Sequence, residues 1–520
     1  RRRLGEIGSS ATLSLSEGSS AMNAFSSARP ARLSRIVSRH ALTRHVATAA
    51  EPQMPPCSFT PEPYQGRPYD EVASLRQRHL NPSLSSNLMF GRPLLVSQGH
   101  MQWLWDHTGK RYLDMFAGIV TVSVGHCHPK VLAAAEHQLG RLWHTSNIYM
   151  YPSVHEFAEK LTAKLPGNLK VCYFTNSGSE ANDLAMMLAR LYTGAFDIIA
   201  LRNAYHGMSP YSGGMCGVGA YRHHWPTGFG VHHAMNADPY RGPWGGQACR
   251  DCLVPSPRQC SCPEGGPCSA ASLYADQVHD VLRHNVSKKR VAAFFAESIQ
   301  GVGGTVQFPK GYLQKVYELI RERGGLCIAD EVQTGFGRMG DTYWGFESHG
   351  VVPDIVTMAK GIGNGFPLAA MVTTPEIASA LNEASFFNTF GGNPVACAVG
   401  SAVVDVIDED GCMANSRERG RRLLLALAAL QQDFPVVGDV RGKGLMLGVE
   451  LVQDRETKEP LPAARVGALL ESCREMGLLI GKGGLNGNVL RIKPPMCITD
   501  ADVDFTVAVL RRSLERISQQ

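Results

Sequence analysis

A lysine and an aspartate stand at the ends of two short apolar segments of this chain. Lys360 follows the run 354–359 and precedes three glycines in five residues, and Asp330 ends the run 327–330. A lysine in such surroundings is poorly solvated, so its amine can lose its proton and attack a carbonyl carbon. The carboxylate of Asp330 can hold a proton on a pyridine nitrogen, which indicates an enzyme that uses pyridoxal phosphate. The alternatives are a surface lysine in a glycine loop and a buried aspartate that caps a helix or forms an ion pair.

Gly178 and Ser179 are candidates for binding the phosphate of this cofactor. They begin a predicted helix, and the free N–H groups and the dipole at a helix start attract an anion. The same segment also fits an ordinary capping box between Ser177 and Glu180, so a purely structural interpretation stays open.

Three further residues could contact the ring or the phosphate. Tyr205, followed by His206 and Gly207, offers an aromatic face to the ring, although a tyrosine of the core would look the same. Gln333 could donate a hydrogen bond to the phenolic oxygen of the ring. Thr389 could supply a hydroxyl to a phosphate, or it could lie in a turn at a strand end.

Short apolar strands that alternate with helices must position these side chains. The strands are expected at 171–174, 197–201, 291–296, 326–329 and 354–358. Continuous apolar strands in such an alternation predict an α/β fold with a mainly parallel sheet covered by helices on both faces. Ligands bind at the carboxyl ends of the strands in such sheets. The polar residues expected at these ends, and therefore in one crevice, are Ser177, Tyr205, Glu297, Asp330 and Lys360.

The chain is expected to fold into two domains. Residues 111–385 form the large cofactor-binding domain, and residues 386–520 form a smaller α+β domain to which the N-terminal segment 51–110 contributes. The predicted elements of the smaller part are a hairpin at 103–114, a strand broken by glycines at 440–450, a strand that starts at Val489 and a last helix at 501–517.

The composition is that of an ordinary globular enzyme, with 44% hydrophobic residues, 19% charged residues and a formal net charge of +5. Neither a nucleic-acid partner nor a membrane span is expected. Residues 1–50 contain eight arginines but only two acids, Glu6 and Glu17. Such a leader is typical of a mitochondrial transit peptide, and hence of a matrix protein; a disordered basic tail is the alternative.

A Cys-rich insertion lies at about residues 241–270. Its cysteines match no zinc-binding pattern well, so a flexible surface segment is favoured over a metal site and no metal is predicted. The fourteen cysteines of the whole chain are scattered, which fits reduced thiols in an intracellular protein rather than a disulfide framework.

Residues of about 85–515 resemble the class III aminotransferases, which are pyridoxal phosphate enzymes of fold type I with a large domain built on a seven-stranded sheet. The segments that carry the resemblance are 176–182, 205–207, 329–337, 358–363 and 388–393. The resemblance implies that Lys360 binds the cofactor covalently, Asp330 contacts the pyridine nitrogen, Tyr205 stacks on the ring, and Gly178 and Ser179 bind the phosphate. It also implies that Thr389 reaches the phosphate of a neighbouring subunit, in a homodimer or homotetramer with shared sites.

Departures from the family pattern bear on the substrate. Ornithine-specific members have a glutamate, here replaced by Val302, that pairs with an arginine matching Arg491, and a tyrosine where this chain has Ile119. A free Arg491 could bind a substrate carboxylate bidentately.

The resemblance therefore implies a ping-pong aminotransferase for small α-carboxylates. The amino donor would be L-alanine, or also β-aminoisobutyrate or a dimethylarginine, and the acceptor would be glyoxylate or pyruvate. The alternatives are an ω-amino acid aminotransferase, a decarboxylase or an aminomutase of the same fold, or a non-enzymatic scaffold.

Overall fold

The computed structural model of the chain describes residues 51–86, 89–222, 227–259, 269–286 and 290–519. The predicted transit peptide, residues 1–50, lies outside the described residues, and so does the stretch 260–268 of the predicted insertion.

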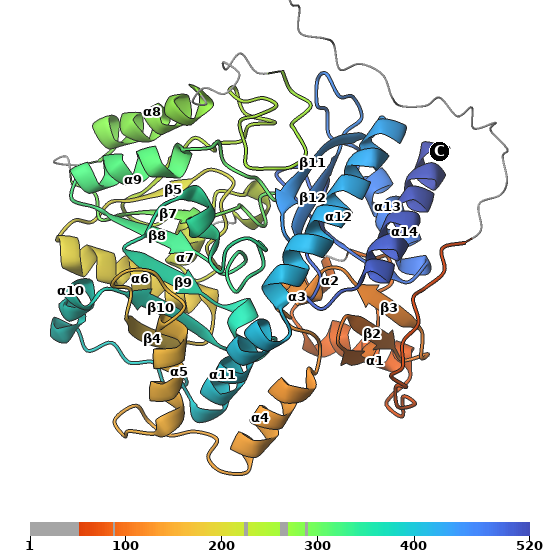
Figure 1. Cartoon of the computed structure of the whole chain (residues 1–520), viewed down its shortest axis with the longest axis horizontal. Helices are drawn as coiled ribbons and strands as arrows, with labels where there is room; N and C mark the ends of the chain where they lie inside the picture. Colours follow the sequence, from red (N-terminus) through yellow and green to blue (C-terminus); the bar gives the residue numbers. More distant parts are fainter. Residues whose placement is uncertain (1–50, 87–88, 223–226, 260–268, 287–289, 520) are drawn as a thin grey trace, which may run out of the picture. The chain divides into compact units, whose positions relative to one another are not determined.

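A seven-stranded sheet carries the predicted carboxyl-end residues, with the strand order β4-β10-β9-β8-β7-β5-β6 (Figure 1). Neighbours from β9 to β6 pair in parallel, whereas β10 runs antiparallel to both β4 and β9. The mainly parallel sheet is therefore confirmed, and β6 and β10 are additions to the predicted strands. The bounds are β4 Val171–Thr175, β5 Ile198–Leu201, β6 Val231–Ala234, β7 Ala293–Glu297, β8 Leu326–Asp330, β9 Ile355–Met358 and β10 Ala369–Thr373.

Helices cover both faces of this sheet because its strands are apolar on both faces (Figure 1). Phe295 packs in one core cluster with Leu184 of α6 (Gly178–Thr193), and its neighbour Phe294 packs in another with Leu313 of α9 (Tyr312–Glu322). This alternation follows the period of two along a strand. The other helices of this part are α4 Pro129–Leu139, α5 Pro152–Thr162, α7 Ser212–Met215, α8 Ser269–His284, α10 Pro375–Ala378 and α11 Pro394–Glu409. Short 3₁₀ turns occur at Gly219–Tyr221, Gly345–His349, Lys360–Gly363 and Ser379–Glu383.

Two four-stranded sheets complete the described fold. One has the order β1-β2-β3-β13 and joins the N-terminal hairpin to a strand from near the C-terminus; the other has the order β11-β12-β15-β14. Their strands are β1 Val96–His100, β2 Trp103–Asp106, β3 Arg111–Asp114, β11 Val437–Lys443, β12 Met446–Leu451, β13 Leu478–Leu479, β14 Gly481–Gly483 and β15 Val489–Ile492. The accompanying helices are α1 Tyr69–His79, α2 Ser83–Ser86, α3 Ala117–Val120, α12 Cys412–Asp433, α13 Ala463–Glu475 and α14 Asp500–Ser518.

The segment 440–450 is a hairpin, not the single broken strand that the sequence predicts. Gly444 lies between β11 and β12 with a φ of +54°. A Cβ at this position would lie 2.3 Å from the carbonyl oxygen of Arg338. The glycine is therefore required by the turn and by a close backbone approach.

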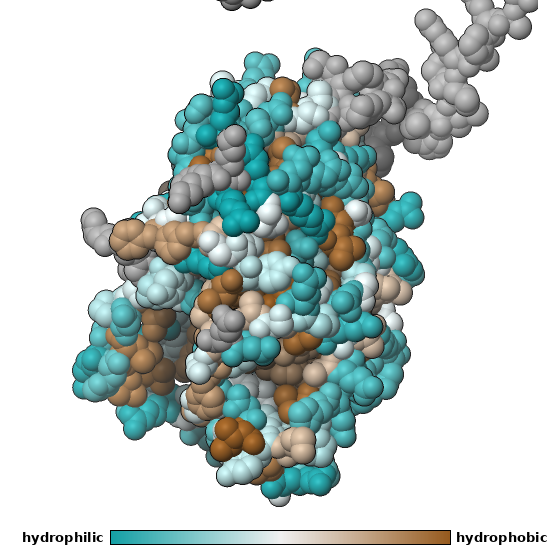
Figure 2. Space-filling model, turned by 90° about the vertical axis from the view of Figure 1, so that its left-hand side faces the viewer, coloured by the Kyte–Doolittle hydropathy of each residue, from teal (hydrophilic) through white to brown (hydrophobic). Residues whose placement is uncertain are grey.

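Exposed apolar side chains gather in two segments of the surface. The loop between α4 and α5 carries Trp143, Ile148, Tyr149 and Met150, of which Met150 is 90% exposed. Phe387 and Phe390 lie in a second segment, and the Phe390 ring is 5.5 Å from the His144 ring. On the side shown in Figure 2, hydrophobic patches alternate with hydrophilic ones. No helix among the described residues is long and apolar enough to cross a membrane.

Candidate active site

A pocket of about 380 Å³ lies at the carboxyl ends of the strands of the large sheet. The predicted residues that line it are Gly178, Ser179, Tyr205, Asp330, Gln333 and Lys360. They come from segments that follow β4, β5, β8 and β9, which are neighbours or near neighbours in the sheet. The convergence expected for the carboxyl ends of parallel strands is therefore present.

Asp330 is held at the bottom of the pocket by three donors. Its Oδ2 accepts a hydrogen bond from Asn182 Nδ2 at 2.9 Å and lies 2.8 Å from His206 Nδ1, and its Oδ1 accepts one from the Val332 N–H at 3.1 Å. Thr357 donates to Asn182 Oδ1 at 2.7 Å and so fixes the orientation of that amide. The carboxylate is thus oriented rather than free to rotate.

Asn182 and His206 are functional residues to which the sequence interpretation gave no role. Both are buried, and both belong to the motif segments 176–182 and 205–207. A signal was present for Asn182, because it is a polar residue among the buried positions of α6, which include Ala181 and Leu184. A buried amide needs hydrogen-bond partners, so its position marks a polar cluster.

Lys360 lines the pocket from the turn that follows β9. Its φ is +51°, in the left-handed region that side chains with a Cβ rarely adopt. Burial lowers the pKa of the Lys360 amine below its usual value; Arg491 lowers it further, while Asp330 and Glu297 oppose the shift. The amine is therefore easier to deprotonate than an exposed lysine, and the surface-lysine alternative is wrong.

The start of α6 contains both a helix cap and a candidate anion site. Ser177 Oγ accepts the Glu180 N–H at 3.3 Å, and the Ser177 carbonyl accepts the Ala181 N–H at 3.0 Å. The N–H groups of Gly178 and Ser179 come before these bonds and have no acceptor within the helix. Because both residues line the pocket, these N–H groups are available to an anion. Glu180 bonds the Asn176 N–H at 2.6 Å instead of closing a reciprocal capping box with Ser177.

Arg491 approaches the pocket from β15 and contacts Gln333. Its Nη2 donates to Gln333 Oε1 at 3.0 Å, and its guanidinium carbon lies 5.2 Å from the centre of the Phe116 ring. Burial lowers the pKa of Arg491 to about 10. Its Nε is buried without a hydrogen-bond partner among the described residues. An unpaired charged donor of this kind is costly unless a ligand pairs with it.

Arg491 contacts the pocket through Gln333 but is not one of its lining residues, and the other three predicted residues also lie outside the lining of the described chain. Val302 is buried, and its carbonyl accepts the Gly484 N–H at 2.9 Å, next to the strand that carries Arg491. Ile119 is 47% exposed in α3, with a φ of +65°. Thr389 is exposed, next to the apolar Phe390.

Glu297 connects the segment around Val302 to Tyr205. Its Oε2 accepts the Gly301 N–H at 2.7 Å, and its Oε1 accepts the Tyr205 N–H at 3.2 Å. Burial raises the pKa of this carboxyl. Gly301 lies so close to Gln333 that a Cβ would be 2.3 Å from Gln333 Oε1 and would displace the end of that side chain. Two segments of the pocket are thereby fixed relative to each other.

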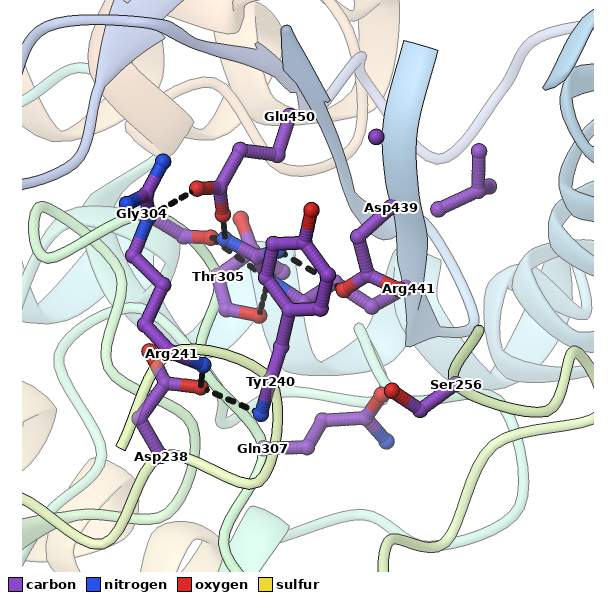
Figure 3. A network of polar contacts seen from close by, with 12 residues as sticks. Asp238, Tyr240, Arg241, Ser256, Gly304, Thr305, Gln307, Asp439, Arg441 and Glu450 are labelled. Carbon is purple, nitrogen blue, oxygen red and sulfur yellow. Dashed lines mark hydrogen bonds and ion pairs between the residues drawn. The ribbon is translucent and has the colours of Figure 1, made fainter. Parts of the chain in front are cut away.

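A buried ionic network supports the turn that follows Val302 (Figure 3). Arg441 Nη2 donates to the Gly304 carbonyl at 2.7 Å and pairs with Glu450 at 2.7 Å, and its Nη1 pairs with Asp439 at 2.8 Å. Burial alone would raise the pKa of Asp439, but Arg250 and Arg441 lower it to about 2. The turn is therefore tied to the β11–β12 hairpin.

The described part of the predicted insertion has exposed residues, such as Leu253 at 63%, and also buried ones. Arg250 is 2% exposed and pairs with Asp439 through two hydrogen bonds, at 2.7 and 2.8 Å. Cys249 is buried as well. The described residues contain no group of three or more His, Cys, Asp or Glu side chains that could hold a metal ion. Three cysteines of the insertion lie outside the described residues: Cys260, Cys262 and Cys268.

Comparisons with known proteins agree with this geometry. The family profile "Aminotransferase class-III" matches residues 89–514. The chain is 54% identical over 483 residues to the human protein named alanine–glyoxylate aminotransferase 2, mitochondrial, and the match covers 93% of both chains.

Solved structures of related enzymes have the same fold. An amine transaminase from an uncultivated Pseudomonas species, in its pyridoxal-phosphate-bound form, has a TM-score of 0.73 at 30% identity, over 82% of this chain and 95% of that chain. A phospholyase from Arthrobacter in complex with phosphoethanolamine has a TM-score of 0.76 at 32% identity, over 86% of this chain and 99% of that chain.

Proposed function

The chain belongs to the class III aminotransferase family, and on this premise we propose that it transfers the amino group of L-alanine to glyoxylate, with pyruvate as the acceptor for donors other than alanine. The human relative is named for alanine and glyoxylate. β-Aminoisobutyrate and dimethylarginines are proposed as further donors. Amino transfer of this kind is a ping-pong reaction with two half-reactions, one that releases the oxo acid of the donor and one that releases the new amino acid.

Pyridoxal phosphate is the cofactor, and the chemistry of the pocket residues fits it. The Gly178 and Ser179 N–H groups match its phosphate, Asp330 matches its pyridine nitrogen, and the ring of Tyr205 matches its ring face. Gln333 can donate to its phenolic oxygen. When bound, the cofactor supplies an electron-withdrawing ring that stabilises negative charge on the α-carbon of the substrate.

Lys360 and Asp330 are proposed as the catalytic residues. Lys360 Nζ would hold the cofactor covalently, and as a free amine it would take the proton from the substrate α-carbon. The lowered pKa of this amine increases the fraction that can accept a proton at neutral pH. Asp330, held by Asn182 and His206, keeps a proton on the pyridine nitrogen.

Arg491 is proposed to bind the substrate α-carboxylate. The observation that carries this assignment is its buried Nε, which has no partner among the described residues, beside an Nη2 that contacts only an amide. A carboxylate would satisfy both donors bidentately. Val302 provides no competing carboxylate, and Ile119 is proposed to border the substrate side chain.

A donor–acceptor assay on the purified holoenzyme tests the function. We expect alanine and glyoxylate to give pyruvate and glycine. Lys360→Ala removes the proton acceptor, so it should lower this rate by about 10⁴-fold, the upper range for losing a general base. The visible absorbance of the bound cofactor should change with it. Release of carbon dioxide from alanine, or phosphate release from phosphoethanolamine without amino transfer, would contradict the proposal.

A second copy of this chain is proposed to complete the site. Thr389 is exposed here, beside the apolar segments of residues 143–150 and 387–390, which a partner subunit would bury. In a dimer the hydroxyl of Thr389 could reach the phosphate in the neighbouring subunit. The mitochondrial matrix is the proposed location, since the human relative is named mitochondrial and residues 1–50 have a transit-peptide composition.

A further inference from the structure

The amide of Gln333 is held by two basic side chains. Its Oε1 accepts a hydrogen bond from Arg491 Nη2 at 3.0 Å and another from Lys493 Nζ at 3.3 Å. An amide oxygen has two lone pairs, so both are used. The group that Gln333 can offer to the pocket is therefore its Nε2, with two donor hydrogens.

Lys493 is a fully buried lysine that the proposed reaction does not use. It follows β15, and its backbone N–H donates to the Met115 carbonyl at 2.8 Å. The second acceptor of its Nζ is the Gly301 carbonyl at 3.4 Å, so both acceptors are uncharged amide oxygens.

The surroundings of Lys493 favour a neutral amine. Burial lowers its pKa well below the usual value; Arg491, Lys360 and Arg338 lower it further, and Glu297 opposes them. A neutral amine still donates hydrogen bonds, and it does not compete with Arg491 for a carboxylate.

Substrate binding changes what holds Gln333. A carboxylate carries a full negative charge and can accept two parallel bonds from Arg491, so it competes with the neutral amide oxygen of Gln333 for the guanidinium donors. The Arg491–Gln333 bond is then weakened, whereas the bond from Lys493 is unaffected. Gln333 also packs against Gly301, where a Cβ would lie 2.3 Å from the same Oε1.

We propose that Lys493 is a positioning residue that keeps the Nε2 of Gln333 directed into the pocket while Arg491 binds the substrate carboxylate. The inference rests on the proposed function, in which Gln333 donates to the phenolic oxygen of pyridoxal phosphate. Without Lys493, the amide would be well oriented in the free enzyme and poorly oriented when a carboxylate is bound.

The test is the pH midpoint of the visible absorbance of the holoenzyme, measured with and without saturating propionate, an unreactive carboxylate. In Lys493→Met we expect the midpoint without propionate to match the wild type. With propionate it should be higher than in the wild type by about 0.5–1 pH unit, the equivalent of one lost hydrogen bond. Lys493→Gln keeps a donor at this position and should restore the wild-type response.

Two further variants separate positioning from a general structural effect. In a Gln333→Leu background, Lys493→Met should add no further shift, as in a double-mutant cycle of coupled residues. Gly301→Ala displaces Gln333 directly, so it should raise the midpoint with and without propionate, and it provides an independent test if Lys493→Met does not fold.

Three results would overturn the inference. The first is an identical response of the pH midpoint to propionate in the wild type and in Lys493→Met. The second is a midpoint shift from Lys493→Met that persists in the Gln333→Leu background. The third is a Gly301→Ala midpoint equal to that of the wild type. A wild-type protein that develops no visible band with pyridoxal phosphate would instead refute the proposed function itself.

Discussion

At the scale of single residues, the proposed substrate choice rests on the guanidinium of Arg491. Arg491 is buried, its Nε has no partner among the described residues, and its nearest hydrogen bond is to the neutral Gln333. Removing the guanidinium should therefore affect substrates more than the cofactor.

Arg491→Ala should lower kcat/KM for alanine and for glyoxylate roughly 30- to 150-fold, because a charge-assisted hydrogen bond contributes about 2–3 kcal/mol. Steady-state kinetics with both substrates measure this change. The matched control is Arg511→Ala, which removes an exposed arginine paired with Asp433. Unchanged kinetics in Arg491→Ala, or a loss that Arg511→Ala reproduces, would refute the assignment.

Residues with their own reactivity were predictable from sequence, and residues that act through others were not. Lys360 and Asp330 stand out because an ionisable group at the end of an apolar strand is rare. Asn182 and His206 orient Asp330, and Lys493 bonds to Gln333 across a large separation in sequence. Such contacts depend on tertiary packing, for which a single sequence gives no direct signal.

At the scale of elements, the start of α6 depends on a glycine from another segment. Gly207 has a φ of +130°, and a Cβ there would lie 2.5 Å from both Ser179 Oγ and Ser212 Oγ. The Met208 N–H also donates to Ser179 Oγ at 3.1 Å. The glycine thus sets the position of Ser179 in the proposed phosphate site.

Gly207→Ala should weaken pyridoxal phosphate binding about 10- to 100-fold, since displacing Ser179 costs a charge-assisted hydrogen bond. Absorbance titration of the apoprotein with the cofactor measures this affinity. The control is Gly194→Ala at the opposite end of α6, with a φ of +62° and open space around a Cβ. That variant should lose about 1–2 kcal/mol of stability from backbone strain but bind the cofactor normally. Equal affinities in the two variants would contradict the role of Gly207.

The predicted elements differ from the observed ones where the local pattern was weak. β6 is an edge strand with two histidines, His232 and His233, whose ring nitrogens bond to Asp197 and to the Met215 carbonyl. Its apolar content is too low to predict a strand. The sequence predicts one strand for the β11–β12 hairpin because its turn is short. Only the close contact at Gly444 shows why the chain reverses there.

At the scale of the whole molecule, the exposed apolar segments predict an assembly. The loop of residues 143–150 and the segment 387–390 lie side by side, as the contact between the His144 and Phe390 rings shows. A two-fold interface would bury the same surface of both copies.

Met150→Asp should convert a dimer into monomers, because a charge in a buried apolar interface has no partner. Light scattering coupled to size exclusion measures the mass of the assembly. Activity should fall as the dimer dissociates, because Thr389 is then separated from the site of the neighbouring subunit. The control is Leu425→Asp, an exposed leucine of α12. A monomeric wild-type protein with full activity would refute the shared site.

The left-handed backbone of Lys360 means that the residue which does the chemistry is a poor choice for the fold. Glycine would adopt the same turn without steric strain, which for a lysine costs roughly 1–2 kcal/mol, and it would place no amine in a partly buried site. Selection for stability alone would therefore replace this lysine. The strained lysine at this position is therefore explained by the proposed activity rather than by the stability of the fold.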